Sequence, residues 1–157
     1  MRKAFLLLAL LGLTNSLWAA DPIVGTWKLN IEKSKFPPGR ESRRLKEEIM
    51  SFKELGKQYE VTFTQTRADG SINTGENLTP RQGGIIENNE ANTEEGSYMV
   101  WTVISPHESY STRLQKGRQV QVSRFVISKD GKTMQQTMIG TDPQGDPFVL
   151  ESVWDKQ

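Results

Sequence analysis

Hydrophobic and polar residues alternate in short runs along most of the chain. In residues 59–65 (YEVTFTQ), Tyr59, Val61 and Phe63 occupy every second position, with polar residues between them. This spacing places the apolar side chains on one face of an extended segment, as in a half-buried β-strand. Similar runs occupy residues 23–29, 98–104, 108–114, 119–127, 132–140 and 148–154.

Turn sequences separate several of these runs. The short connections that would join antiparallel strands include Ala68-Asp69-Gly70, Lys116-Gly117, Lys129-Asp130-Gly131 and the longer segment 142–147. After residue 20, alanine, the best helix former, occurs only at Ala68 and Ala91. The pattern predicts one all-β domain over residues 21–157, an antiparallel barrel of eight to ten strands whose closure would remove exposed sheet edges.

Residues 41–55 (ESRRLKEEIMSFKEL) fit two kinds of element. A helix would carry on one face Leu45, Ile49, Phe52 and Leu55. A strand would alternate Glu48, Met50 and Phe52 against Ile49, Ser51 and Lys53. The pattern of this segment leaves both interpretations open.

The first twenty residues have a different pattern. Met1-Arg2-Lys3 is basic, residues 4–13 (AFLLLALLGL) are apolar, and residues 14–20 end in small side chains. This order is typical of a secretory signal peptide. The apolar run is too short to cross a hydrocarbon layer of about 30 Å. We expect cleavage after Ala19 or Ala20, which would give a secreted or periplasmic protein without a transmembrane anchor.

Composition excludes several classes of site. The chain has no cysteine, which excludes disulfide scaffolds, cysteine-ligated metals and thiol nucleophiles. His107 is the only histidine, and we interpret it as exposed or hydrogen-bonded rather than catalytic. The net charge of +1, from 20 basic and 19 acidic residues, argues against nucleic acid as a partner. We therefore predict that the protein is not an enzyme and has no catalytic residues, metal site or cofactor.

Both ends of the chain resemble a known group of proteins. Residues 21–30 (DPIVGTWKLN), continuing through residues 33–36 (KSKF), are similar to the opening of small exported lipocalin-like proteins of soil bacteria. Residues 128–134 (SKDGKTM) and 153–157 (VWDKQ), with Gly140-Thr141-Asp142 and Gly145 between them, resemble the final hairpin of that family. The resemblance implies a lipocalin-like β-barrel, favours a strand over residues 41–55, and brings no established activity.

Gly25 and Trp27 match the Gly-x-Trp motif of the wider lipocalin and calycin group. The resemblance implies that this motif lies on the first strand, that Trp27 plugs one end of the barrel, and that a basic residue late in the chain packs across its ring. Arg113 and Arg124 are both candidates for that basic residue. We interpret Trp27 as structural, because a large aromatic side chain at a barrel end contributes mainly through burial.

The resemblance favours the hypothesis that the barrel binds a small apolar or amphipathic molecule. The candidate ligand-binding residues are Tyr59, Val61, Phe63, Tyr98, Val100 and Trp101. The alternative is a structural or protein-interaction β-domain with a filled interior and no small ligand. Hydrophobic residues make up only 35% of the chain, including those of the predicted signal peptide. Because the same few apolar side chains must also hold the fold together, we expect any ligand site to be small, partly polar or confined to one end.

Overall fold

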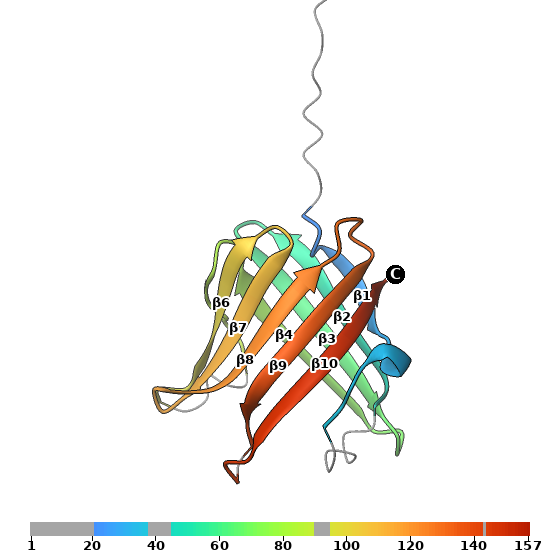
Figure 1. Ribbon diagram of the computed structural model, residues 1–157. Helices are drawn as coiled ribbons and strands as arrows, with labels where there is room; N and C mark the ends of the chain where they lie inside the picture. Colours follow the sequence, from blue (N-terminus) through green and yellow to red (C-terminus); the bar gives the residue numbers. More distant parts are fainter. Residues whose placement is uncertain (1–20, 38–44, 90–94, 143) are drawn as a thin grey trace, which may run out of the picture.

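The computed structural model describes residues 21–37, 45–89, 95–142 and 144–157, so the predicted signal peptide at residues 1–20 lies outside the described residues. These residues form one ten-stranded antiparallel sheet rolled into a barrel (Figure 1). The strands are β1 (Gly25–Leu29), β2 (Leu45–Leu55), β3 (Gln58–Arg67), β4 (Ile72–Pro80), β5 (Gly84–Ile85), β6 (Tyr98–Ser105), β7 (Glu108–Gln115), β8 (Arg118–Ile127), β9 (Thr133–Thr141) and β10 (Pro147–Lys156). One short 3-10 helix, Ile31–Lys33, follows β1. The prediction of an all-β barrel of eight to ten strands is confirmed.

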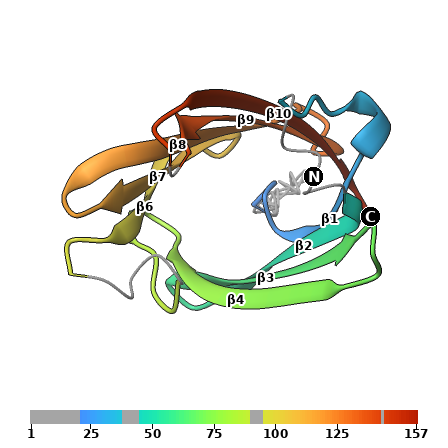
Figure 2. The same cartoon turned by 90° about the horizontal axis from the view of Figure 1, so that it is seen from below.

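Two sets of contacts between strands close the barrel. In the first, β1 pairs with both β2 and β10, so strands from the two ends of the chain lie side by side. In the second, β4 and β6 are joined through β5 and the residues after it (Figure 2). Leu78 of β4 and Glu87 exchange two backbone hydrogen bonds, of 3.0 and 2.9 Å. A single β-bridge therefore completes the ring on this side.

The segment with two possible interpretations is a strand from Leu45 onward, and residues 41–44 lie outside the described residues. Its pairing with β3 places Met50 opposite Phe63 and Phe52 opposite Val61. Because paired residues share a face of the sheet, Met50 and Phe52 point to the interior with their partners. The alternation in the sequence therefore describes this strand correctly, and the helical spacing is wrong.

Strand β4 was not recognisable from the hydrophobic pattern. Its inner face carries small or polar residues, among them Asn73, Gly75 and Asn77. A Cβ atom at Gly75 would lie 2.2 Å from Cζ of Phe63, which faces it from β3. The ring of Phe63 thus occupies the space that a side chain of β4 would fill. The other inward residues of β4 are polar, so this strand has no apolar alternation of its own.

The hydrophobic core fills the end of the barrel where β1 begins and β10 ends. Aromatic rings cross the interior there, with ring centroids 6.5 Å apart between Phe52 and Trp101 and 5.4 Å apart between Trp101 and Phe125. Tyr59 meets Phe52 edge-on at 6.1 Å. Contacts of this geometry add to the free energy gained by burial. Packing across the interior holds the two halves of the sheet together at this end.

Trp27 lies in this core with no exposed surface, and its Nε1 donates a 2.8 Å hydrogen bond to the carbonyl oxygen of Ile23. The cation across its ring is Lys156, with Nζ 5.1 Å from the ring centroid. The prediction of Arg113 or Arg124 for this role is wrong. Arg124 is exposed on the outer face, where it pairs with Glu108, and Arg113 is an exposed residue near the far end of β7. Lys156 takes the role because β10 pairs with β1 and sets Lys156 opposite Trp27.

Candidate functional site

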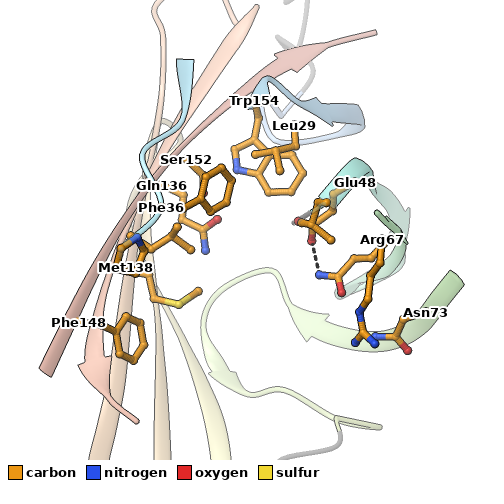
Figure 3. A pocket seen from close by; sticks show the side chains of 14 residues that line it. Leu29, Phe36, Glu48, Arg67, Asn73, Gln136, Met138, Phe148, Ser152 and Trp154 are labelled. Atoms are coloured by element: carbon orange, nitrogen blue, oxygen red, sulfur yellow. Dashed lines mark hydrogen bonds between the residues drawn. The ribbon is translucent and has the colours of Figure 1, made fainter. Parts of the chain in front are cut away.

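A cavity lies inside the barrel at the end opposite the aromatic core. Its volume is about 330 Å³. Figure 3 shows the side chains that line it. This value falls at the lower end of the range of about 300–1,000 Å³ typical of small-molecule sites. The lining residues are Leu29, Phe36, Pro37, Leu45, Glu48, Gln65, Arg67, Asn73, Gln136, Met138, Phe148, Leu150, Ser152 and Trp154.

The cavity has two chemically different walls. One wall comes mainly from β9, β10 and the segment after the 3-10 helix, and it is largely apolar, with Met138, Phe148 and Phe36 among its side chains. The opposite wall comes from β2, β3 and β4 and carries polar groups, including Glu48 and Arg67 (Figure 3). An interior of this kind fits a molecule with a hydrocarbon body and at least one polar group.

The polar wall arises from a gradient along the inner faces of the strands. Along β3 the inward positions are apolar from Tyr59 to Phe63 and become polar at Gln65 and Arg67. Strand β2, which runs in the opposite direction, has its polar inward residue, Glu48, at the same end of the barrel. Each strand therefore contributes apolar side chains to the core and polar side chains to the cavity.

Glu48 and Gln65 face each other across the pairing of β2 and β3. Nε2 of Gln65 donates a 2.8 Å hydrogen bond to Oε1 of Glu48 (Figure 3). Burial raises the pKa of the Glu48 carboxyl above its usual value, and the hydrogen bond from Gln65 opposes that change. A partly buried carboxyl group of this kind is protonated more readily than one in water, because burial disfavours the charged form.

Trp154 forms the boundary between the core and the cavity. Its side chain is almost entirely buried, with 3% of its surface exposed, yet it also lines the cavity. Among the described residues no group accepts a hydrogen bond from its indole Nε1. A buried donor without an acceptor is costly. The end of the cavity next to the core therefore holds a buried N–H group without an acceptor among the described residues.

The sequence matches no protein-family model and no curated protein. Solved structures nevertheless match the fold: As-p18, described as an extracellular fatty acid binding protein, superimposes with a TM-score of 0.53 at 12% identity, over 87% of this chain and 97% of its own. The chain has the lipocalin-like barrel fold. The siderocalin Ex-FABP gives a TM-score of 0.46 at 9% identity, over 87% of this chain and 71% of its own. Zebrafish ileal bile acid-binding protein, complexed with cholic acid, gives 0.43 at 12% identity, over 87% and 99%.

The lipocalin-like barrel places the six predicted ligand-binding residues in three different environments. Tyr59, Val61 and Trp101 are buried in the core, and Phe63 is a partly buried neighbour on the same inner face. Tyr98 and Val100 lie on the outer face, because successive residues of a strand alternate and Trp101 points inward. None of the six lines the cavity beside Trp154. Their contact with a ligand stays a prediction.

The sequence interpretation missed the residues of the polar wall. It selected mainly apolar side chains as candidate ligand contacts, whereas the polar wall of the cavity presents Glu48, Gln65 and Arg67. A signal for Glu48 was present, because the alternation of Phe52 and Met50 continues directly to it. A polar residue that continues an inward-facing apolar series marks the point where a barrel interior stops being filled core.

A second group of polar residues closes the other end of the barrel. The hydroxyl of Tyr59 donates a hydrogen bond to Asp21, and the guanidinium of Arg81 lies 5.5 Å from the centroid of the Tyr59 ring. Burial, reinforced by Asp21 and opposed by Arg81, raises the pKa of Tyr59 to about 12. These contacts anchor the chain just before β1. We interpret the group as structural, because Tyr59 is 3% exposed and its hydroxyl is already bonded.

Other classes of site find no support in the described ranges. There is no group of three or more histidine, cysteine, aspartate or glutamate side chains placed to bind a metal ion. The ring of His107 makes a hydrogen bond within the fold, with Nδ1 3.2 Å from the carbonyl oxygen of Ile127. Over the same ranges, no helix has the length and apolar character of a membrane-spanning segment.

Proposed function

We propose that this protein is an exported carrier that binds a small amphipathic molecule in the cavity between Glu48 and Trp154. The observation that supports this most directly is an interior space of about 330 Å³ with one apolar wall and one polar wall. Filled barrel interiors leave few voids larger than a water molecule. A space of this size costs packing energy, and binding a ligand would compensate for that cost.

The cavity argues against the alternative of a filled interior without a ligand. Side chains fill the barrel around Trp27 and Phe52, but at the other end they leave the space beside Ser152 and Met138 open. A purely structural domain would gain stability by filling that space with larger side chains. As-p18, an extracellular fatty acid binding protein, has a similar fold, and this similarity supports a binding role for the barrel.

Export rests on the sequence. Residues 1–20 have the basic, apolar and small-residue order of a signal peptide. The described domain begins at Asp21, whose carboxyl accepts the hydrogen bond from Tyr59. Cleavage after Ala19 or Ala20 would therefore leave the anchoring contacts of the first strand intact. The carrier would then act outside the cytoplasm, in the periplasm or beyond.

The test is to look for a bound molecule in the protein purified from its own source by native mass spectrometry. We expect a mass above that of the polypeptide, and an extract that raises the melting temperature of the stripped protein, because a ligand specific to the folded state stabilises it. A bare mass under gentle conditions, together with no thermal shift across a panel of lipids and metabolites, would contradict the proposal.

A cavity-blocking variant locates the site. Ser152 is buried and lines the cavity from β10, so Ser152→Phe should place a ring in the space and abolish binding. Val149→Phe is the matched control, because Val149 lies on the outer face of the same strand with 52% of its surface exposed. If Ser152→Phe folds and still binds as the native protein does, the cavity is not the site.

A further inference from the structure

The charges that line the cavity are few and unevenly placed. Among the described residues of its lining, Glu48 is the only acid and Arg67 the only base. Glu48 is partly buried and lies opposite Gln65. Arg67 is exposed and lies two residues after Gln65, at the last position of β3. Arg67 therefore lies at the exposed rim of the cavity, and Glu48 lies deeper inside it.

Glu48 has no cationic partner among the residues that the structure describes. Its hydrogen bond comes from the neutral amide of Gln65, and it takes part in no salt bridge there. The neighbouring acid, Glu47, points the other way and pairs with Lys28 at 2.5 Å on the outer surface. Lys28 therefore pairs with Glu47 outside the barrel. The carboxyl group of Glu48, inside the barrel, accepts one hydrogen bond from a neutral donor, the amide of Gln65.

A partly buried carboxylate in this position favours one class of ligand group. An ammonium group would bring a positive charge and several N–H donors to the oxygen that Gln65 does not bind. A hydroxyl group would bring one donor and no charge. A carboxylate placed beside Glu48 would bring a second negative charge close to the first, which disfavours ionisation of both groups.

We propose that the cavity selects amphipathic amines, and that Glu48 binds their ammonium group while the hydrocarbon body packs against the apolar wall. The inference rests on the proposed function, because it concerns the charge of the ligand in the same cavity. Met138 and Phe148 lie on the wall across from Glu48 (Figure 3), so a ligand with an ammonium group at one end contacts both walls at once.

The experiment compares three probes with the same hydrocarbon chain: octylamine, octanol and octanoate. At pH 7 the first is a cation, the second is neutral and the third is an anion. Calorimetry on the stripped protein should show the amine binding at least about tenfold more tightly than octanoate, with octanol between them. This ranking needs no variant, so it tests the inference even if a substituted chain fails to fold.

Glu48→Gln then assigns the preference to one side chain. It should weaken octylamine binding about tenfold and leave octanoate binding unchanged or stronger, because the variant removes the negative charge and keeps a polar side chain. The matched control is Glu47→Gln, which makes the same change in net charge one residue away on the outer face. It should leave the ranking of the three probes unaltered. An equal change in both variants would overturn the assignment to Glu48.

The outcomes separate the two proposals. If octanoate binds as tightly as octylamine or more tightly, and Ser152→Phe abolishes that binding, the amine preference is wrong and the carrier function stands. If none of the three probes binds, the amine preference fails, and the mass spectrometry and thermal-shift panel decide the carrier function. If the probes bind and Ser152→Phe leaves their binding intact, both proposals fail, because each of them depends on this cavity.

Discussion

The side chain of Lys156 crosses Gly25 and ends over the ring of Trp27. Its Nζ lies 5.1 Å from the centroid of the ring and donates a 2.9 Å hydrogen bond to the carbonyl oxygen of Pro22. A Cβ atom at Gly25 would lie 2.7 Å from Cε of this lysine. Both defining residues of the Gly-x-Trp motif, Gly25 and Trp27, therefore contact the same side chain, that of Lys156.

The first prediction concerns the charge of Lys156. Lys156→Met keeps most of the hydrocarbon stem but removes the ammonium group, so the variant loses a cation–π contact and one hydrogen bond. We expect the free energy of unfolding to fall by about 1–2 kcal/mol in urea denaturation. Lys132→Met is the control, because Lys132 is exposed at the same end of the barrel and should change stability by less than about 0.5 kcal/mol.

The second prediction concerns the glycine beneath that lysine. Gly25→Ala should cost about 1–3 kcal/mol, because the new methyl group meets Lys156 and because Gly25 has a φ of 132° that other residues rarely adopt. In Gly25→Ala combined with Lys156→Ala the clash is gone and only the backbone strain remains. The combined loss should therefore be smaller than the sum of the two single losses. Strictly additive losses would show that the lysine does not constrain position 25.

The third prediction concerns Tyr59. Its pKa is raised from 10.0 to about 12, so the neutral phenol is favoured in the folded protein. The stabilisation that this group provides is complete below pH 10 and is lost as the pH rises through about 12. Tyr59→Phe should cost about 1–3 kcal/mol at pH 7, since Asp21 loses its donor, and the difference from the native protein should shrink above pH 10.

An absorbance titration of the phenols measures the same property directly. The chain has three tyrosines, and Tyr59→Phe should remove the one that ionises near pH 12. Tyr110→Phe is the comparison, because Tyr110 donates to Glu108 outside the core. If Tyr110→Phe, rather than Tyr59→Phe, removed that ionisation, the assignment to Tyr59 would be wrong.

The fourth prediction links stability to the proposed binding role of Glu48. Burial raises the pKa of this carboxyl group in the folded protein. Its contribution to stability is therefore complete below its ordinary pKa of 4.5 and is lost as the pH rises through the raised value. Glu48→Gln should remove that loss, so the variant should be more stable than the native protein at neutral pH and show no gain at pH 3.

Thermal unfolding across the acid range checks this prediction, with Glu47→Gln as the control for the surface charge. A native protein less stable than its own variant is expected where a group is kept for binding rather than for folding. Equal stability of the native protein and Glu48→Gln from pH 3 to pH 8 would show that burial of this carboxyl group costs nothing.

The kind of element at most positions and the two faces of each strand follow from the local hydrophobic pattern. The alternation around Val61 and Phe63 has a period of two, and that period fixes which side chains share a face wherever the chain is extended. The same rule described β2 correctly, because Glu48, Met50 and Phe52 do share one face. Local pattern was sufficient here because face sharing is a property of a single strand.

Which face is the interior, and what occupies it, depends on contacts between different strands. Alternation separates Val100 from Trp101, but the pairing of β6 with its neighbours puts the tryptophan inside. The cation over Trp27 depends on the pairing of the first strand with the last, a contact between the two ends of the chain. Strand β4 shows no apolar pattern, because Asn73 and Asn77 are polar and Phe63 of the neighbouring strand fills the space in front of Gly75. The cavity beside Glu48 exists only where the inner faces of several strands become polar or leave space at the same end, which no single segment specifies.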